Sequence, residues 1–356
     1  MTWVSLCSFE NANWHTKSAA QWFPVDTTQT SNTVLRDGSM VFEVAPVDFI
    51  ADAIVLFNFR SEDQRFRMGA RLTSDLTLTF RHEFDGQKKH CTVTLPEKAL
   101  RSGFRVVYHW SEGLQIGGLS VECIASGQID MFDFDAPLPV HRRNLEDMTR
   151  LRHLAKAHPK LLFYSFSNEV EPVSLGSAIA APARVLTPSG YCPIEDLKIG
   201  QLVLTEDLGP LPIRWIGVRN IPAAGQFRPL RLRAPYHDLN GRDLLIAPRQ
   251  NLFLEESMLE YLFGVEEALV EARHLVNEQS ILKETRLRMV RYYQILLDEH
   301  AILNVGGARL ESSLHTKDVP IKGPPASAPI HASTRYPKLR SHEAHTLRAM
   351  RRNMAL

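Results

Sequence analysis

Asp298 and His300 are the two side chains whose types and spacing best fit proton transfer. They are two residues apart on a predicted strand, and side chains two apart on a strand share one face. A carboxylate beside an imidazole can orient the ring and relay a proton near neutral pH. A hydrogen-bonded structural pair would have the same spacing, and it is the favoured interpretation.

A second acidic pair, Glu83 and Asp85, flanks the Asp85-Gly86 turn. Two neighbouring carboxylates are the machinery of glycoside hydrolysis. Turns also collect solvated carboxylates for conformational reasons alone. We therefore interpret these two residues as solvated turn residues.

Four aromatic residues could form platforms for a sugar ring: Trp14, Trp22, Tyr108 and Trp110. Sugar-binding sites use exposed aromatic faces of this kind. Tyr108 and Trp110 fall on the apolar phase of an alternating strand, however, which favours core packing for both.

Composition excludes several classes of protein. The chain has 356 residues, of which 44% are apolar and 23% charged, with a net charge of +1. The net charge therefore gives no electrostatic field that would attract nucleic acid. The sequence also contains no apolar run of about 18 residues, so it predicts no membrane span. The four cysteines are scattered without a CxxC pair, so we predict no disulfide framework, no metal site and no cofactor.

The amino terminus lacks a basic segment followed by a continuous apolar segment. This argues against a Sec-type signal peptide and predicts a cytoplasmic location by default, with leaderless export as the alternative.

Residues 60–135 alternate apolar and polar side chains in several short runs separated by turn residues. Strict alternation indicates antiparallel strands with one buried face, and this rhythm predicts a β-sandwich. The fold class is therefore mainly β. The sandwich, predicted over 1–141, is jelly-roll-like and weakly resembles concanavalin-like lectins and glucanases. This resemblance implies a carbohydrate or protein ligand for the amino-terminal domain.

The pattern changes at Arg142, where apolar residues recur at helical spacing. We predict a helix over 144–157 with Asn144 as its N-cap, inside a linker that spans 142–173. A second domain is predicted over 174–318, mostly of strands with short helices. Residues 319–356 are predicted to form a Pro-rich linker and a basic helix that packs on this domain.

Several motifs between 184 and 313 follow one another in a recognisable order. The first reads Arg-Val-Leu-Thr-Pro-Ser-Gly, and the second contains Ile-Glu-Asp-Leu-Lys-Ile-Gly followed by Gln201, where Asp is usual. The blocks are 184–190, 193–205, 212–217, 242–248, 262–264, 272–276, 295–303 and 310–313, with a tail at 337–344. Together they resemble the bacterial Hedgehog/intein-type (Hint) domain, a horseshoe-like all-β fold.

The resemblance implies protein autoprocessing. Active Hint domains begin with Cys, sometimes Ser, which attacks the carbonyl of the preceding peptide bond and forms a thioester or ester. A His near the scissile nitrogen acts as the general acid, because an amine leaves poorly unless it is protonated.

This chain departs from the pattern at both positions. The nucleophile position is Ala178, and the His position is Gln250, whose carboxamide has no proton to give near pH 7. The residues that shape the following turn are Pro182 and Ala183 in place of Gly and Thr. The resemblance therefore implies a degenerate domain that acts as a binding or scaffold module rather than as an enzyme.

Ser177, one residue before the lost nucleophile, offers an alternative. A slip of one residue would place its hydroxyl in the site, with Asp298 and His300 as the remaining proton relay. The simpler interpretation is a linker serine, because the His at position 250 that would activate it is absent.

Overall fold

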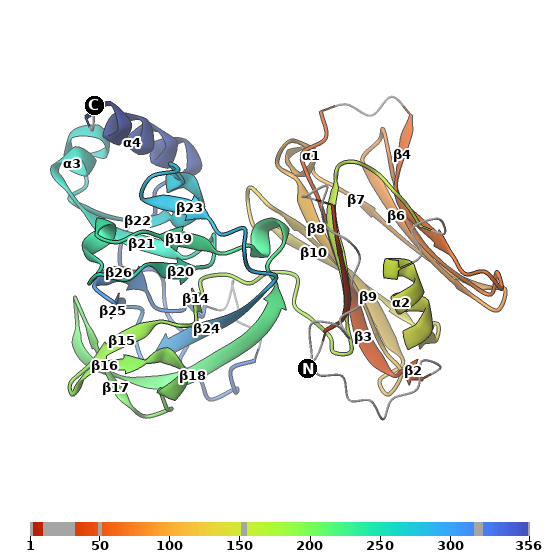
Figure 1. The fold of residues 1–356 in the computed structure, drawn as a ribbon, viewed down its shortest axis with the longest axis horizontal. Coiled ribbons are helices and arrows are strands. Elements are labelled where there is room, and N and C mark those ends of the chain that lie inside the picture. Colours follow the sequence, from red (N-terminus) through yellow and green to blue (C-terminus); the bar gives the residue numbers. More distant parts are fainter. Residues whose placement is uncertain (1–2, 10–32, 49–51, 151–154, 317–322, 355–356) are drawn as a thin grey trace. The chain divides into compact units, whose positions relative to one another are not determined.

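The computed structural model describes residues 3–9, 33–48, 52–150, 155–316 and 323–354. The chain divides into two compact units, Met1–Ser174 and Leu175–Leu356. Each unit has its own hydrophobic core. Figure 1 labels the elements of both units.

The amino-terminal unit is built mostly of strands. Its elements are β1 (Trp3–Ser8), β2 (Val34–Leu35), β3 (Asp37–Val44), β4 (Ala53–Arg60), β5 (Phe66–Thr73), β6 (Thr77–Phe84), β7 (Gln87–Thr94), α1 (Glu97–Ser102), β8 (Phe104–Ser111), β9 (Ile116–Cys123), β10 (Ile129–Asp135), β11 (Val140–His141), α2 (Arg142–Arg150), β12 (Ala155–Ala157) and β13 (Leu161–Ser167).

Two antiparallel sheets pack face to face in this unit (Figure 1). One has the order β1-β13-β3-β8-β9-β10 and the other β12-β4-β5-β6-β7. Aromatic side chains from both sheets fill the space between them, with Phe42 of one sheet 5.2 Å from Phe57 of the other, measured between ring centroids. The predicted mainly β fold and the antiparallel sandwich are confirmed.

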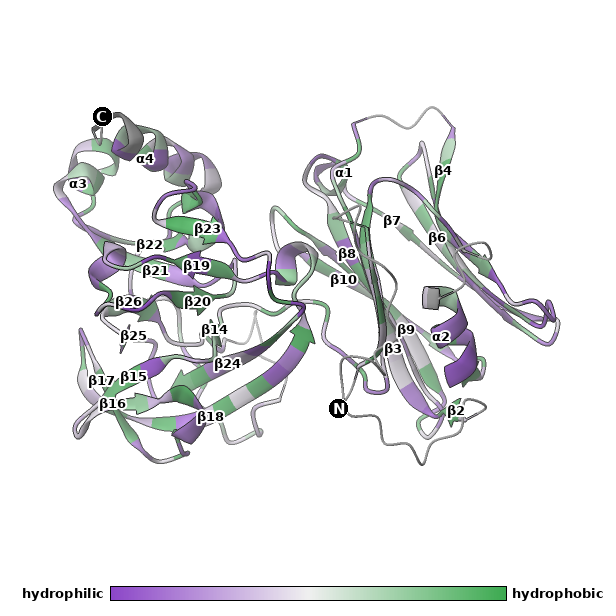
Figure 2. Ribbon diagram, in the orientation of Figure 1, coloured by the Kyte–Doolittle hydropathy of each residue, from purple (hydrophilic) through white to green (hydrophobic). Residues whose placement is uncertain are grey.

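The segment 142–173, which was predicted as a linker, belongs to the amino-terminal unit in the structure. Its helix, α2, is shorter than expected, and residues 155–157 form β12, which pairs with β4. Strand β13 lies between β1 and β3 in the six-stranded sheet. Most of α2 is hydrophilic in Figure 2, while Leu145 and Met148 are buried in the sandwich core. The segment therefore completes the first unit instead of connecting two units.

The candidate sugar platforms Tyr108 and Trp110 are only 1% and 2% exposed, so they are core residues. Trp14 and Trp22 lie outside the described residues. The two acidic residues near the turn form ion pairs, Asp85 with Arg65 and Glu83 with Arg81.

A buried charged cluster lies on the face of the six-stranded sheet opposite the sandwich core. Arg105 on β8 stands between Glu43 on β3 and Glu122 on β9, its two cross-strand neighbours. Its guanidinium lies 2.8 Å from the carboxylate of Glu43 and 2.9 Å from that of Glu122. It also donates to the carbonyl of Val173 at 3.0 Å, which fixes the end of this unit to the sheet.

His82 is a titratable side chain inside the sandwich core. It follows Leu78 and Phe80 on the buried face of β6, as the period of two requires. Its Nδ1 lies 2.9 Å from the hydroxyl of Tyr108, while its Nε2 is buried and has no partner among the described residues. Burial lowers the pKa of His82 from 6.5 to about 3.

The amino-terminal unit should lose stability as the pH falls from about 6.5 towards 3. The unfolded chain takes up a proton on His82 in this range and the folded chain does not, so acid favours unfolding. The free energy of unfolding should fall by up to about 1.4 kcal/mol for each unit of pH. Urea unfolding at several pH values measures this slope.

The variant His82→Gln should lower the slope, because glutamine does not titrate. His90→Gln is the matched control, since His90 is an exposed histidine on the adjacent strand β7. An unchanged slope in His82→Gln would show that burial does not shift the titration of His82.

The carboxy-terminal unit is also mostly β, with 3-10 turns labelled η. Its elements are β14 (Ile179–Ala180), β15 (Arg184–Thr187), β16 (Gly190–Pro193), η2 (Ile194–Asp196), β17 (Leu202–Thr205), β18 (Gly209–Pro222), η3 (Gly225–Phe227), β19 (Leu230–Leu232), η4 (Tyr236–Asp238), β20 (Leu244–Ile246), β21 (Asn251–Glu255), α3 (Ser257–Phe263), β22 (Glu267–Glu271), η5 (Ala272–Leu275), β23 (Ile281–Lys283), β24 (Met289–Leu297), β25 (Ile302–Val305), β26 (Ala308–Glu311) and α4 (Ser341–Met354).

One strongly curved sheet runs through this unit in the order β22-β21-β26-β25-β17-β18-β24-β14-β20-β19-β23. The long strands β18 and β24 form its central pair. Helix α4 packs onto the same core through Ala344 and Leu347, preceded by Leu339. The carboxy-terminal helix was predicted to pack in this way. No helix in the described parts of the chain is long and apolar enough to cross a membrane.

Candidate functional site

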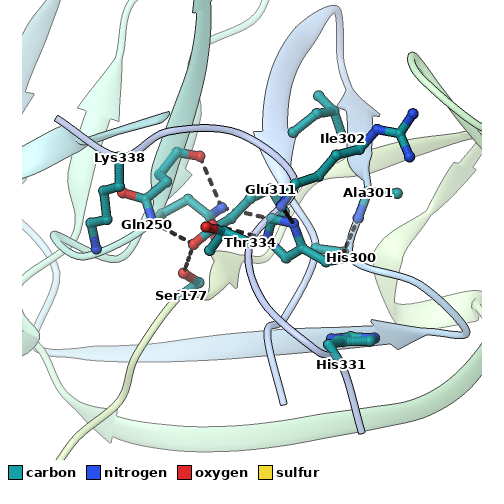
Figure 3. A network of polar contacts seen from close by, with 12 residues as sticks. Ser177, Gln250, His300, Ala301, Ile302, Glu311, His331, Thr334 and Lys338 are labelled. Atoms are coloured by element: carbon teal, nitrogen blue, oxygen red, sulfur yellow. Dashed lines mark hydrogen bonds and ion pairs between the residues drawn. The ribbon is translucent and has the colours of Figure 1, made fainter. Parts of the chain in front are cut away.

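Ser177, His300 and Gln250 come together around one carboxylate, that of Glu311. Ser177 precedes β14, Gln250 precedes β21, and His300 lies in the turn between β24 and β25. Glu311 is the last residue of β26, which pairs with both β21 and β25. The curvature of the sheet therefore unites residues that are far apart in the sequence (Figure 3).

The carboxylate of Glu311 accepts hydrogen bonds on both oxygens. Ser177 donates its hydroxyl to Oε1, and Asn251 donates its amide to the same oxygen at 2.6 Å. Oε2 lies 3.2 Å from Nε2 of His300. The backbone carbonyl of Glu311 accepts from the side-chain amide of Gln250 at 3.0 Å. Glu311 is 4% exposed, and Asn251, His300 and Gln250 are also buried, while Ser177 is partly exposed.

Asp298 does not belong to this network. Strand β24 ends at Leu297, so Asp298 and His300 lie in a turn and not on one strand face. Asp298 forms an ion pair with Arg214, with Nε to Oδ1 at 2.6 Å, and both side chains are partly exposed. The prediction that Asp298 and His300 share one strand face is therefore wrong, and their role in proton transfer stays a prediction. The carboxylate beside His300 belongs to Glu311.

Ala178 and Gln250 occupy neighbouring, buried places in the fold. The carbonyl of Ala178 accepts a hydrogen bond from the backbone N–H of Ala247 at 2.8 Å, which joins the two sequence blocks. Gln250 is 1% exposed, and its amide nitrogen also donates to the carbonyl of Asn251 at 3.2 Å. Its amide thus bridges β21 and β26.

The segment 331–339 passes over this network (Figure 3). The backbone N–H of Arg335 donates to Nδ1 of His300 at 3.4 Å, and His331 lies with its ring centroid 6.3 Å from that of His300. Burial lowers the pKa of His331. Lys338 pairs with Glu271 at 2.7 Å. The segment predicted to be a loop or linker is therefore fixed to the sheet in its described part.

Glu271 fixes the carboxy-terminal end of the segment 331–339 through its ion pair with Lys338. Burial alone would raise the pKa of Glu271, but the cations Lys338, Arg273 and Arg249 outweigh it and lower the pKa to about 2. The carboxylate is therefore ionised throughout the physiological range.

Glu311 and Asn251 were not singled out from the sequence. Glu311 lies inside the block 310–313, but nothing in its local pattern marks it as the link between Ser177 and His300. In the described ranges no cluster of three His, Cys, Asp or Glu could hold a metal ion. The four cysteines, all in described parts of the chain, are not joined in disulfides, and Cys7 and Cys123 are buried.

The network can do limited chemistry. Glu311 can accept the hydroxyl proton of Ser177, because the two are hydrogen-bonded. Its other carboxylate oxygen is hydrogen-bonded to His300. His300 faces the other oxygen of the carboxylate, so it orients Glu311 rather than Ser177. A serine with a carboxylate partner is a weak arrangement for nucleophilic attack, because an adjacent imidazole is the usual base.

The family model described as "Hint domain" matches residues 178–317. Residues 178–317 therefore match the Hint domain family, which relates this part of the chain to autoprocessing domains.

Solved structures of this class are similar to the chain at low identity. A bacterial intein-like domain from Clostridium thermocellum is 17% identical, with 39% of this chain and 99% of that chain covered and a TM-score of 0.28. The gp41-1 intein is 13% identical, with 38% and 98% covered and a TM-score of 0.26.

A further similarity is to the CBM2 module of the evolved Dit protein of Lactobacillus casei BL23 phage J-1. It is 12% identical, with 41% of this chain and 58% of that chain covered and a TM-score of 0.24. Comparison with the curated proteins gave no match.

Proposed function

We propose that the protein is a non-cleaving Hint protein, whose carboxy-terminal unit serves as a folded binding or scaffold module. The observation that carries this proposal is the hydrogen bonding of the Gln250 side chain. Its amide donates to two backbone carbonyls, those of Glu311 and Asn251, and it has no titratable proton for a leaving amine. The methyl group of Ala178 cannot attack a carbonyl.

The full-length chain should stay intact when it is incubated with hydroxylamine or a thiol. Intact-mass spectrometry over time measures this, because either reagent would release a fragment from an ester or thioester. Fragments that end or begin at residues 176–178 would overturn the proposal.

The double variant Ala178→Cys/Gln250→His tests which residues account for the expected absence of self-cleavage. Cleavage before residue 178 in this variant would assign the loss to these two side chains alone. An intact double variant would assign it also to the backbone around Pro182 and Ala183, which differs from the usual Gly and Thr.

Self-cleavage through Ser177 is the second candidate, supported by the hydrogen bond from its hydroxyl to Glu311. In that reaction Oγ of Ser177 attacks the carbonyl carbon of Gly176, and an ester forms as the C–N bond to Ser177 breaks. The hydroxyl proton passes through Glu311 to the freed amine. Water then hydrolyses the ester, which separates the two fragments. Fragments in the wild type that disappear in Ser177→Ala but persist in Ser174→Ala would establish this route.

A further inference from the structure

A cavity of about 670 Å³ opens in the carboxy-terminal unit, away from the network around Glu311. Its walls come from η4, β21, the turn at 277–281 and α4. Ser177, Gln250, His300 and Glu311 do not line it. Its volume lies in the range of about 300–1,000 Å³ that is typical of small-molecule sites.

The inner part of the cavity is apolar. Leu252 and Leu254 of β21 line it, together with Leu275 and Ile281, and all four belong to the core cluster of this unit. An apolar group that enters the cavity would leave water and contact these side chains.

His237 adds a polar atom that has no partner. Its Nε2 is buried and makes no hydrogen bond within the described residues. His237 and Asp238 both have left-handed backbones, with φ of 58° and 57°. An ideal Cβ on Gly307 would lie 2.0 Å from the carbonyl oxygen of Asp238, so only glycine fits beneath this turn. The turn is thus held in a conformation that is unfavourable by itself.

Of the three arginines among the described residues that line the cavity, two form ion pairs with glutamates. Arg309 pairs with Glu255 at 2.8 Å, and Arg351 pairs with Glu256 at 2.7 Å. Arg348 on α4 donates Nη1 to the carbonyl of Val276 at 3.1 Å and faces no carboxylate among the residues that the structure describes.

Burial lowers the pKa of His237 to about 4, so its ring is neutral at pH 7 and carries one N–H. The guanidinium of Arg348 and the neutral ring of His237 both line the cavity and give it polar donors beside the apolar side chains. Asp238, which also lines the cavity, is exposed, and water screens its charge.

We propose that this cavity binds a small organic monocarboxylate with an apolar body. The carboxylate would contact Arg348 beside the ring of His237, and the apolar body would lie on Leu252, Leu254 and Leu275. A single uncompensated guanidinium matches one negative charge better than the two charges of a phosphate monoester. The proposal holds whether or not the Hint domain cleaves itself.

The test compares 4-phenylbutyrate with its neutral amide, 4-phenylbutyramide, and with 4-phenylbutylamine, on the full-length chain by ligand-observed NMR. The carboxylate should bind in the millimolar range or tighter and about tenfold more tightly than the amide, because only the carboxylate makes charge-assisted hydrogen bonds. Tighter binding of the amine would overturn the proposal, because it would indicate that the carboxylate of Asp238 binds the charged group of the ligand.

Arg348→Gln should weaken binding of the carboxylate about tenfold and leave binding of the amide unchanged. Arg340→Gln is the matched control, since Arg340 is an exposed arginine just before α4 that does not line the cavity. His237→Asn removes the imidazole but tolerates the left-handed backbone, and it should weaken binding of both compounds.

Three further results would overturn the proposal: absence of binding by the wild type up to millimolar concentration, equal binding of carboxylate and amide, or an unchanged affinity in Arg348→Gln. Thermal unfolding of each variant, compared with the wild type, separates a lost contact from a lost fold.

Discussion

Glu311→Ala should lower the free energy of unfolding of the carboxy-terminal unit by about 3 kcal/mol or more. Glu311 is buried and accepts from Ser177, Asn251 and His300, so its removal leaves three polar groups without their partner. A buried donor without an acceptor costs the free energy of its lost hydration. Urea unfolding followed by fluorescence measures the change.

Glu311→Gln should have a smaller effect, because the amide keeps one acceptor and nearly the same volume. Glu255→Gln is the matched control, since the Glu255 side chain is 60% exposed and its ion pair with Arg309 lies at the surface. This control should change stability by less than about 1 kcal/mol. A Glu311→Ala variant as stable as Glu255→Gln would show that the network contributes nothing to the fold.

Arg105→Met should destabilise the amino-terminal unit by about 3–5 kcal/mol. The substitution keeps much of the side-chain volume but leaves the carboxylates of Glu43 and Glu122 buried without their shared cation. It also removes the donor to the carbonyl of Val173. Thermal and urea unfolding of the full-length chain measure the effect.

Arg101→Met provides the comparison for Arg105→Met. Arg101 pairs with Glu97 on α1, and the two side chains are 80% and 68% exposed. Such an exposed pair on a helix contributes about 0.5 kcal/mol or less. Similar stabilities of the two variants would contradict a structural role for the buried cluster.

The fold of both units was predictable where apolar and polar residues alternate. In β6 the buried residues Leu78, Phe80 and His82 follow the period of two that the sequence displays. Strand β13 was missed because six of its seven residues are buried, so both of its faces are covered and no alternation marks it. A continuous apolar run is ambiguous between a buried strand and other elements.

The candidate site was predictable only in part. The motif pattern drew attention to Ser177 and His300, and the structure brings both to one carboxylate. That carboxylate, Glu311, is 134 residues from Ser177 in the sequence, so local spacing could not link them. Asp298 was predicted to lie on a strand with His300, but β24 ends one residue before Asp298.

The position of β13 has a consequence for synthesis on the ribosome. Strand β1 leaves the ribosome before the other described strands of this unit, yet its partner in the sheet, Leu161–Ser167, is the last of those strands to emerge. Until then β1 lacks this strand partner and β3 presents an open edge, and open edges pair readily with wrong strands. We expect a nascent chain that ends before Leu161 to remain sensitive to protease, and one that has exposed Ser167 to become resistant.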